Sequence, residues 1–304
     1  MALVALAMFT AACGDDSNDP AGSGRLRVVA TTVQIAALTR EVGGDRIDLT
    51  GLIPAGADAH EFEPVASDLT AIEGAALILR HGIGIDDWLD DTLSASDARV
   101  VTVTDGIDLQ RGALEDDAEP SDDDHGKGAF DPHVWHDPDN AKVMVRNIAD
   151  ALADADAPSA DAYRAAADGY SATLDATKAQ IQDIIGEIPP ENRKLVTNHD
   201  AFGYFARAFG LQIVGAVIPG ISTQAEPSAR QTAALLDTIE RERVKAIFAE
   251  SSASPGLAEQ LARDAGVTIV DDLYGDSLGE PGSSADTIDG MLLANARKIA
   301  DALK

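Results

Sequence analysis

The stretch ADAYRAAADGYSATLDATKAQIQDIIGEI, residues 160–188, contains no proline and lies between Pro158-Ser159 and Pro189-Pro190. Proline fits the first turn of a helix but breaks its interior. This pattern therefore predicts one continuous helix over residues 158–188, in which Gly169 is a minor weakness. With a rise of about 1.5 Å per residue the helix would be ~45 Å long. A helix of that length would act as a stiff linker between whatever lies on either side.

The chain on both sides of this helix alternates between short runs rich in β-branched residues and stretches with apolar residues at helical spacing. The expected strands span residues 26–32, 48–53, 75–80, 99–104, 194–198, 212–217, 246–249 and 267–271. The expected helices include residues 34–42, 65–73, 202–209, 228–241 and 255–265. Such alternation is typical of parallel sheets covered by helices. We therefore predict an α/β fold of two domains, residues 26–157 and 189–304, each a mostly parallel sheet flanked by helices and joined by one long rigid linking helix.

The N-terminal residues carry an export pattern. Ala2 to Ala12 form an apolar run that is too short to span a membrane but fits the apolar region of a signal peptide. Small residues precede the only cysteine, Cys13, and resemble the processing box of bacterial lipoproteins, in which that cysteine is lipidated. Thr10 stands where such boxes usually have Leu, and no Lys or Arg precedes the run. We expect residues 1–25 to be a signal peptide and tether, and the body to be extracytoplasmic and attached to the bacterial membrane only through its lipid.

Charge and cysteine content exclude several classes of function. Lys and Arg total 23 against 52 Asp and Glu, a formal charge of −29, which argues against nucleic-acid partners. One cysteine allows neither an intrachain disulfide nor a cysteine-ligated zinc site, so a tight metal site would need His and carboxylates. Residues 115–128, EDDAEPSDDDHGKG, are expected to form a mobile acidic loop. Its His125 could offer transient metal contacts, although a solvated loop without ligands is the simpler interpretation.

Three histidines and one aspartate are the candidate metal ligands. His60 lies in PAGADAHEFEP, His133 in DPHVWHDP, His199 in LVTNHDAFGYF and Asp276 in DDLYGDSLG. Except for His133, each follows the carboxyl end of an expected parallel strand, which is where open α/β sheets bind ligands. Three imidazoles and one carboxylate suit an ion of the zinc class. Asp271 and Asp272 lie close enough to Asp276 to leave the choice of the late carboxylate open.

These motifs, together with ISTQAEPSAR and FAESSASP, resemble the zinc- and manganese-binding solute-binding lipoproteins of bacterial ABC transporters, the cluster A-I type. The resemblance runs from about Leu26 to the last residue and includes the linking helix. It implies a monomeric binding protein, not an enzyme, that captures a metal ion in the cleft between its domains and delivers it to a membrane permease. It also implies that His60, His133, His199 and Asp276 are the ligands.

Two further residues have weaker claims on the metal. His136 follows His133 at zinc-ligand spacing, but in the resembling family this position is usually not a ligand, so we expect it to pack or to support a ligand. Glu61, next to His60, is an alternative oxygen ligand or an outer acceptor.

The choice of metal and of function leaves alternatives. Manganese-binding relatives tend to carry Glu at the position of His199, so a nitrogen-rich site favours zinc, with manganese as the alternative. Zinc relatives often have a long histidine-rich loop, whereas residues 115–128 are rich in aspartate. A surface adhesin is a second possibility. A zinc hydrolase is disfavoured, because a fourth ligand would close the shell and the sequence has no H-E-x-x-H motif.

Overall fold

Parallel strands form two sheets with the same strand order in the computed structural model, which describes residues 24–94, 96–114, 130–252 and 255–304. The first sheet has the order β2-β1-β3-β4 and the second β6-β5-β7-β8, and every strand pair is parallel. The first sheet comprises β1 Leu26–Ala30, β2 Ile47–Gly51, β3 Leu77–Arg80 and β4 Arg99–Thr102. The second comprises β5 Lys194–Thr197, β6 Gln212–Ala216, β7 Ala246–Glu250 and β8 Thr268–Leu273. We call residues 26–157 and 189–304, which contain these sheets, the first half and the second half.

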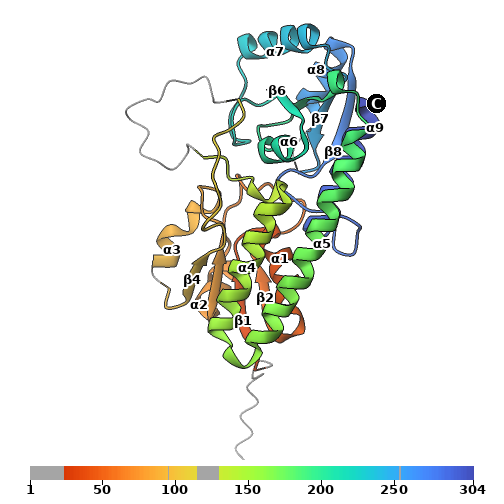
Figure 1. Ribbon diagram of the computed structural model, residues 1–304. Coiled ribbons are helices and arrows are strands. Elements are labelled where there is room, and N and C mark those ends of the chain that lie inside the picture. The colour runs from red at the N-terminus through yellow and green to blue at the C-terminus, as the bar shows by residue number, and fades with distance from the viewer. Residues whose placement is uncertain (1–23, 95, 115–129, 253–254) are drawn as a thin grey trace, which may run out of the picture.

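Helices flank both sheets, which confirms the predicted fold class (Figure 1). The first half contains α1 Val33–Gly43, α2 Ala66–Gly74, α3 Asp90–Ser94 and α4 Pro138–Ala155, the second α6 Gly203–Phe209, α7 Ala229–Glu242, α8 Gly256–Ala265 and α9 Ile288–Leu303. Local chemistry fixes several helix starts. Ser228 and Gln231 form a reciprocal capping box at the start of α7, which the sequence predicts as a helix over residues 228–241.

One long helix, α5 (Ala160–Gly186, 27 residues), runs along both halves (Figure 1). It begins after a single turn at Ala157–Ser159 and ends before Pro189 and Pro190, close to the predicted bounds. Its buried side chains repeat at helical spacing: Tyr163, Ala167, Tyr170, Leu174, Thr177, Ile181 and Ile185. Apart from Thr177, they belong to one apolar core that continues from the first sheet into the second. The linker is therefore a packed structural element and not a free tether.

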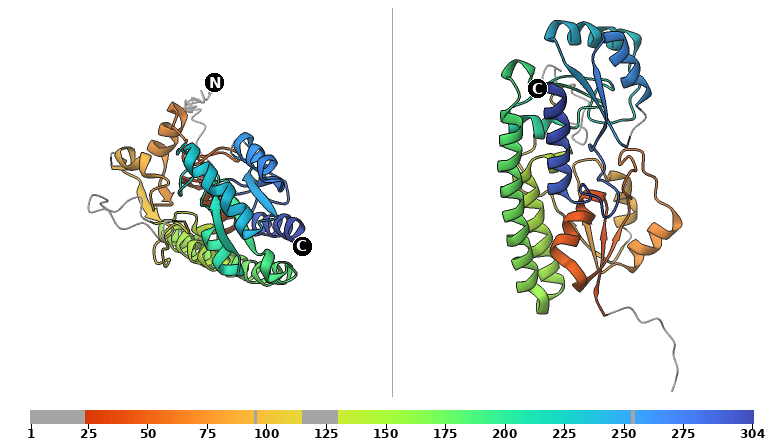
Figure 2. Two further views of the ribbon diagram at one scale, coloured as in Figure 1. Left: turned by 90° about the horizontal axis from the view of Figure 1, so that it is seen from above. Right: turned by 90° about the vertical axis from the view of Figure 1, so that its right-hand side faces the viewer.

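The last helix, α9, leaves the second sheet and returns toward the first half. It packs beside α5 and also contacts α1 (Figure 2). The Tyr170 hydroxyl on α5 donates to Asp289 Oδ1 on α9 at 2.8 Å. Helix α9 thus attaches the second half to the linking helix α5.

Three expectations lie wholly or almost wholly outside the described residues: the signal peptide and tether over residues 1–25, the lipidation of Cys13, and the acidic loop 115–128 with His125. Within the described part of the chain, no helix combines the length and the apolar character needed to cross a bilayer.

Candidate metal centre

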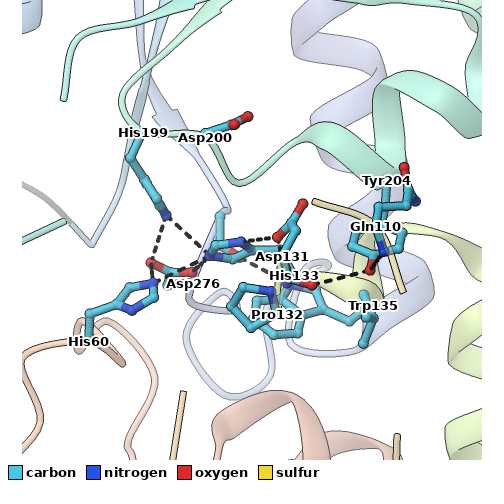
Figure 3. Close-up of polar contacts among 12 residues, drawn as sticks. His60, Gln110, Asp131, Pro132, His133, Trp135, His199, Asp200, Tyr204 and Asp276 are labelled. Carbon is cyan, nitrogen blue, oxygen red and sulfur yellow. Dashed lines mark hydrogen bonds and ion pairs between the residues drawn. The ribbon is translucent and has the colours of Figure 1, made fainter. Parts of the chain in front are cut away.

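The four candidate side chains meet between the halves, although they lie far apart in the sequence. His60 belongs to the loop after β2, His133 immediately precedes a short turn at the start of α4, His199 follows β5 and Asp276 follows β8. One ligand atom from each lies within 4.8 Å of the others. Figure 3 shows the three rings and the carboxylate pointing toward one another. Of the three neighbouring aspartates, the structure places Asp276 here, whereas Asp271 and Asp272 are exposed on β8.

The distances within this cluster suit four groups that bind one shared ion. His133 Nε2 lies 3.0 Å from Asp276 Oδ1, and His199 Nε2 lies 3.3 Å from Asp276 Oδ2. His60 Nε2 lies 3.5 Å from Asp276 Oδ2. His133 Nε2 lies 3.2 Å from His199 Nε2 and 3.4 Å from His60 Nε2. Ligands about 2.0–2.1 Å from a tetrahedral ion stand ~3.3 Å apart. The four groups therefore have the spacing of a ligand shell that needs little rearrangement.

Burial is uneven around the cluster. The side chains of His133, His199 and Asp276 are fully buried, whereas that of His60 is 10% exposed. His60 also borders a cavity of about 350 Å³ whose walls are mostly apolar and include Ile83, Ile85, Trp88 and Ile221. An ion would therefore reach the cluster from the side of His60.

Two buried carboxylates fix the tautomers of the innermost imidazoles. His133 Nδ1 lies 2.6 Å from Asp131 Oδ1, and His199 Nδ1 lies 2.6 Å from Glu250 Oε1. A neutral imidazole has one N–H, and when Nδ1–H donates to a carboxylate, Nε2 keeps its lone pair. Both lone pairs then point into the cluster, as carboxylate partners of metal-binding histidines arrange them elsewhere.

The same carboxylates control protonation of the site. Burial lowers the pKa of His133, but Asp276 and Asp131 outweigh it, so the pKa is raised well above its usual value. Burial also lowers the pKa of His199, but the charges of Glu250 and Asp276 outweigh burial, so the pKa of His199 is raised as well. For Asp276, burial raises the pKa but the surrounding imidazoles lower it further. His133 and His199 therefore hold a proton more readily than a free imidazole does.

His136 and Glu61 lie outside the cluster. His136 is fully buried and stacks on Phe202 with ring centroids 4.8 Å apart. Burial, followed by the charge of His133, lowers the pKa of His136 to about 3, so its ring is neutral. Glu61 is exposed. Sequence reasoning gave neither Asp131 nor Glu250 a role, although Asp131 stands two residues before His133 and Glu250 ends β7 beside the site.

Two parallel-sheet halves joined by a long helix, with three imidazoles and a carboxylate between them, define a class: the metal-binding substrate-binding proteins of ABC transporters. Residues 28–302 match the ZnuA family, zinc-uptake complex component A periplasmic, and the chain belongs to this family. The membership confirms the resemblance seen in the motifs. Its members are binding proteins that serve transporters and are not enzymes.

Relatives in this family are named for different metals. The manganese ABC transporter substrate-binding lipoprotein PsaA of Streptococcus pneumoniae is 30% identical over 98% of this chain and 95% of its own length. The iron ABC transporter substrate-binding lipoprotein MtsA of Streptococcus pyogenes is 29% identical over 96% and 93%. The periplasmic zinc binding protein TroA of Treponema pallidum superimposes with a TM-score of 0.80 and 30% identity over 92% of this chain and 99% of TroA. Family membership thus defines metal binding without defining the ion.

Proposed function

We propose that the protein captures one zinc ion between its halves, with His60, His133, His199 and Asp276 as ligands, and delivers it to the permease of an ABC importer. One observation carries the proposal. The innermost imidazoles, with Nδ1 engaged by Asp131 and Glu250, direct their Nε2 lone pairs toward the carboxylate of Asp276. Lone pairs and a carboxylate repel one another in a buried site unless a proton or a cation lies among them.

Zinc is the proposed ion because the shell offers three nitrogens and one carboxylate. Imidazole-rich sites bind zinc more tightly than manganese, which prefers oxygen ligands. Manganese is the second candidate for two reasons. PsaA, a manganese lipoprotein by name, is similar to this chain along nearly its whole length. Both oxygens of Asp276 face the imidazoles, so this carboxylate could supply two oxygen ligands to a larger ion.

We assign a separate role in metal binding to each of the two domains and to the linking helix. Residues 26–157 and 189–304 act as two domains around the ion, and the linking helix 158–188 limits their movement. The proposed position in the cell is outside the cytoplasm, attached to the membrane by a lipid on Cys13. This part of the proposal rests on the sequence before Cys13 and on relatives that are lipoproteins by name.

Metal content and competition titration test the proposal on the mature protein, with His133→Ala and His199→Ala beside the wild type. We expect one zinc per wild-type chain, not displaced by excess manganese. Both substitutions should raise the dissociation constant of zinc strongly, although His199→Ala should still bind one zinc per chain at saturating zinc. Glu61→Gln is the matched control that should leave the constant unchanged. Displacement of zinc by manganese would favour the second candidate. Equal binding by the wild type and both histidine variants would refute the site.

A further inference from the structure

The segment that carries Asp276 changes its attachment from the second half to the first within two residues. Asn295 of α9 holds both backbone groups of Tyr274: Tyr274 N donates to Asn295 Oδ1 at 3.0 Å, and Asn295 Nδ2 donates to the Tyr274 carbonyl at 2.7 Å. Up to Tyr274, the chain after β8 is therefore fixed to its own half.

From Gly275 onward the partners come from the first half. The carbonyl of Gly275 accepts from Trp135 Nε1 at 3.2 Å. The carbonyl of Asp276 accepts from Gln34 Nε2 of α1 at 2.8 Å, and both residues are fully buried. Gly56 N donates to the hydroxyl of Ser277 at 2.6 Å. Three consecutive residues are thus held by three separate parts of the first half.

His199, in contrast, is held by residues of its own half. Its carbonyl accepts from the Thr197 hydroxyl at 2.7 Å, and its Nδ1 pairs with Glu250 of β7, so both partners belong to the second half. Other hydrogen bonds do cross between the halves: Tyr204 donates to the Asp131 carbonyl and Gln224 to the His60 carbonyl. Leu114 N also donates to Asp200 Oδ2, beside His199, at 2.9 Å. Within the described residues, and leaving aside contacts among the four proposed ligands, no hydrogen bond or ion pair joins His199 or Glu250 to the first half.

We propose that Gln34 is a positioning residue for the metal site, which holds Asp276 to the first half so that the four ligands divide three to one. This inference rests on the proposed function. The order of the sequence suggests two ligands per half, with His60 and His133 before the linker and His199 and Asp276 after it. The hydrogen bonds of residues 275–277 instead join Asp276 to the half that carries His60 and His133, whereas the side chain of His199 is held by Glu250 of the second half.

The division has a consequence for release. When the halves separate slightly, the side chain of His199 withdraws with Glu250, Asp276 stays with the first half, and the bond from Gln224 to the His60 carbonyl breaks. The ion is then held by two imidazoles and a carboxylate with one coordination position open. An open position is what an incoming ligand from an acceptor needs in order to take the metal.

The test compares zinc dissociation rates, measured by transfer to an excess of chelator, for wild type, Gln34→Leu, His199→Ala and the double variant. Leu fills a similar volume but cannot donate to the Asp276 carbonyl. Thr39→Val, another buried polar residue of α1, is the matched control. We expect Gln34→Leu to release zinc at least tenfold faster, Thr39→Val to release it at the wild-type rate, and His199→Ala still to bind one zinc per chain. Gln34→Leu should speed release from His199→Ala as well, because the two residues hold different bodies.

An Asp276→Asn background separates positioning from a general loosening of the fold. Asn keeps one oxygen ligand, and the effect of Gln34→Leu should shrink there, because Gln34 acts through Asp276. The same effect in all backgrounds, or wild-type release by Gln34→Leu, would overturn the inference, and so would loss of all zinc from His199→Ala. If Gln34→Leu does not fold, Ser277→Ala frees the same segment and should give the same pattern of rates. Failure of the wild type to bind any metal would instead refute the proposed function, so the two failures are distinguishable.

Discussion

Asp131 and Glu250 are single residues that each orient one imidazole of the site, and each does so with one carboxylate oxygen. Each is buried, and each lies 2.6 Å from the Nδ1 atom of its histidine. Together they determine which nitrogen carries the proton and therefore which nitrogen is free for a metal.

Replacing Glu250 with Gln should weaken zinc binding by about 10- to 100-fold. The amide keeps the volume and can still accept from Nδ1–H, but it removes the charge that makes the imidazole more basic. Competition titration measures the change, with the exposed Glu240→Gln as the control. Wild-type affinity in Glu250→Gln would show that this carboxylate serves packing only.

Metal affinity should fall as the pH is lowered, and the fall should begin above the ordinary histidine pKa of about 6.5. The pKa values of His133 and His199 are raised because their carboxylate neighbours outweigh burial. Protons therefore occupy these rings in the metal-free protein and must leave before an ion binds. Titrations at several pH values between about 6 and 9, with proton release measured in buffers of different ionisation enthalpy, check this. An affinity independent of pH over that range would contradict it.

At this scale the sequence predicted the grouping of His60, His133, His199 and Asp276, because their motifs sit beside the ends of strands and helices. It did not predict the partners. Glu250 is 51 residues from His199, and Gln34 is 242 residues from Asp276. No periodicity links positions so distant, and only the folded chain brings them together. That the four residues are ligands remains a prediction.

At the scale of elements, replacing glycine with alanine should have opposite effects on stability at two positions, Gly275 and Gly169. A Cβ on Gly275 would lie 1.8 Å from Glu250 Oε2, whereas a Cβ on Gly169 in α5 would meet nothing within 4 Å. Gly275→Ala should therefore push the Glu250 carboxylate away from His199 and weaken zinc binding at least tenfold. Overpacking should also cost about 1–3 kcal/mol of stability.

Gly169→Ala should leave zinc binding unchanged and stabilise the protein by about 0.5–1 kcal/mol, because glycine is entropically costly inside a helix. Thermal unfolding and zinc titration of both variants measure the pair of effects. Wild-type zinc affinity in Gly275→Ala would show that Glu250 can move without consequence.

The bounds of the strands and of the long helix were predicted from the sequence more accurately than any other feature. All the strands expected from β-branched runs are present within a few residues of their predicted ends, and α5 ends at Gly186, just before the proline pair. The path of α9 was not predictable. Its apolar face is compatible with packing on either half, and only the tertiary structure selects α5 and α1.

For the whole molecule, the continuous core along α5 predicts small movements between the halves when metal binds. Bending that helix would break buried apolar contacts that begin at Tyr163 and continue to Ile185. X-ray scattering from metal-free and zinc-loaded protein should give nearly equal radii of gyration, with the metal-free His133→Ala variant as a reference. A clear contraction on zinc addition would show a wide hinge closure instead.

The return of α9 to the linker also bears on the order in which the protein can fold. Residues 288–303 are synthesised after the first half and the linker, yet they cover α5, contact α1 and hold the segment next to Asp276 through Asn295. The first sheet and its helices therefore emerge long before the helix that completes their surroundings. Until α9 is in place, α5 and α1 therefore lack one of the helices that complete the apolar core around them.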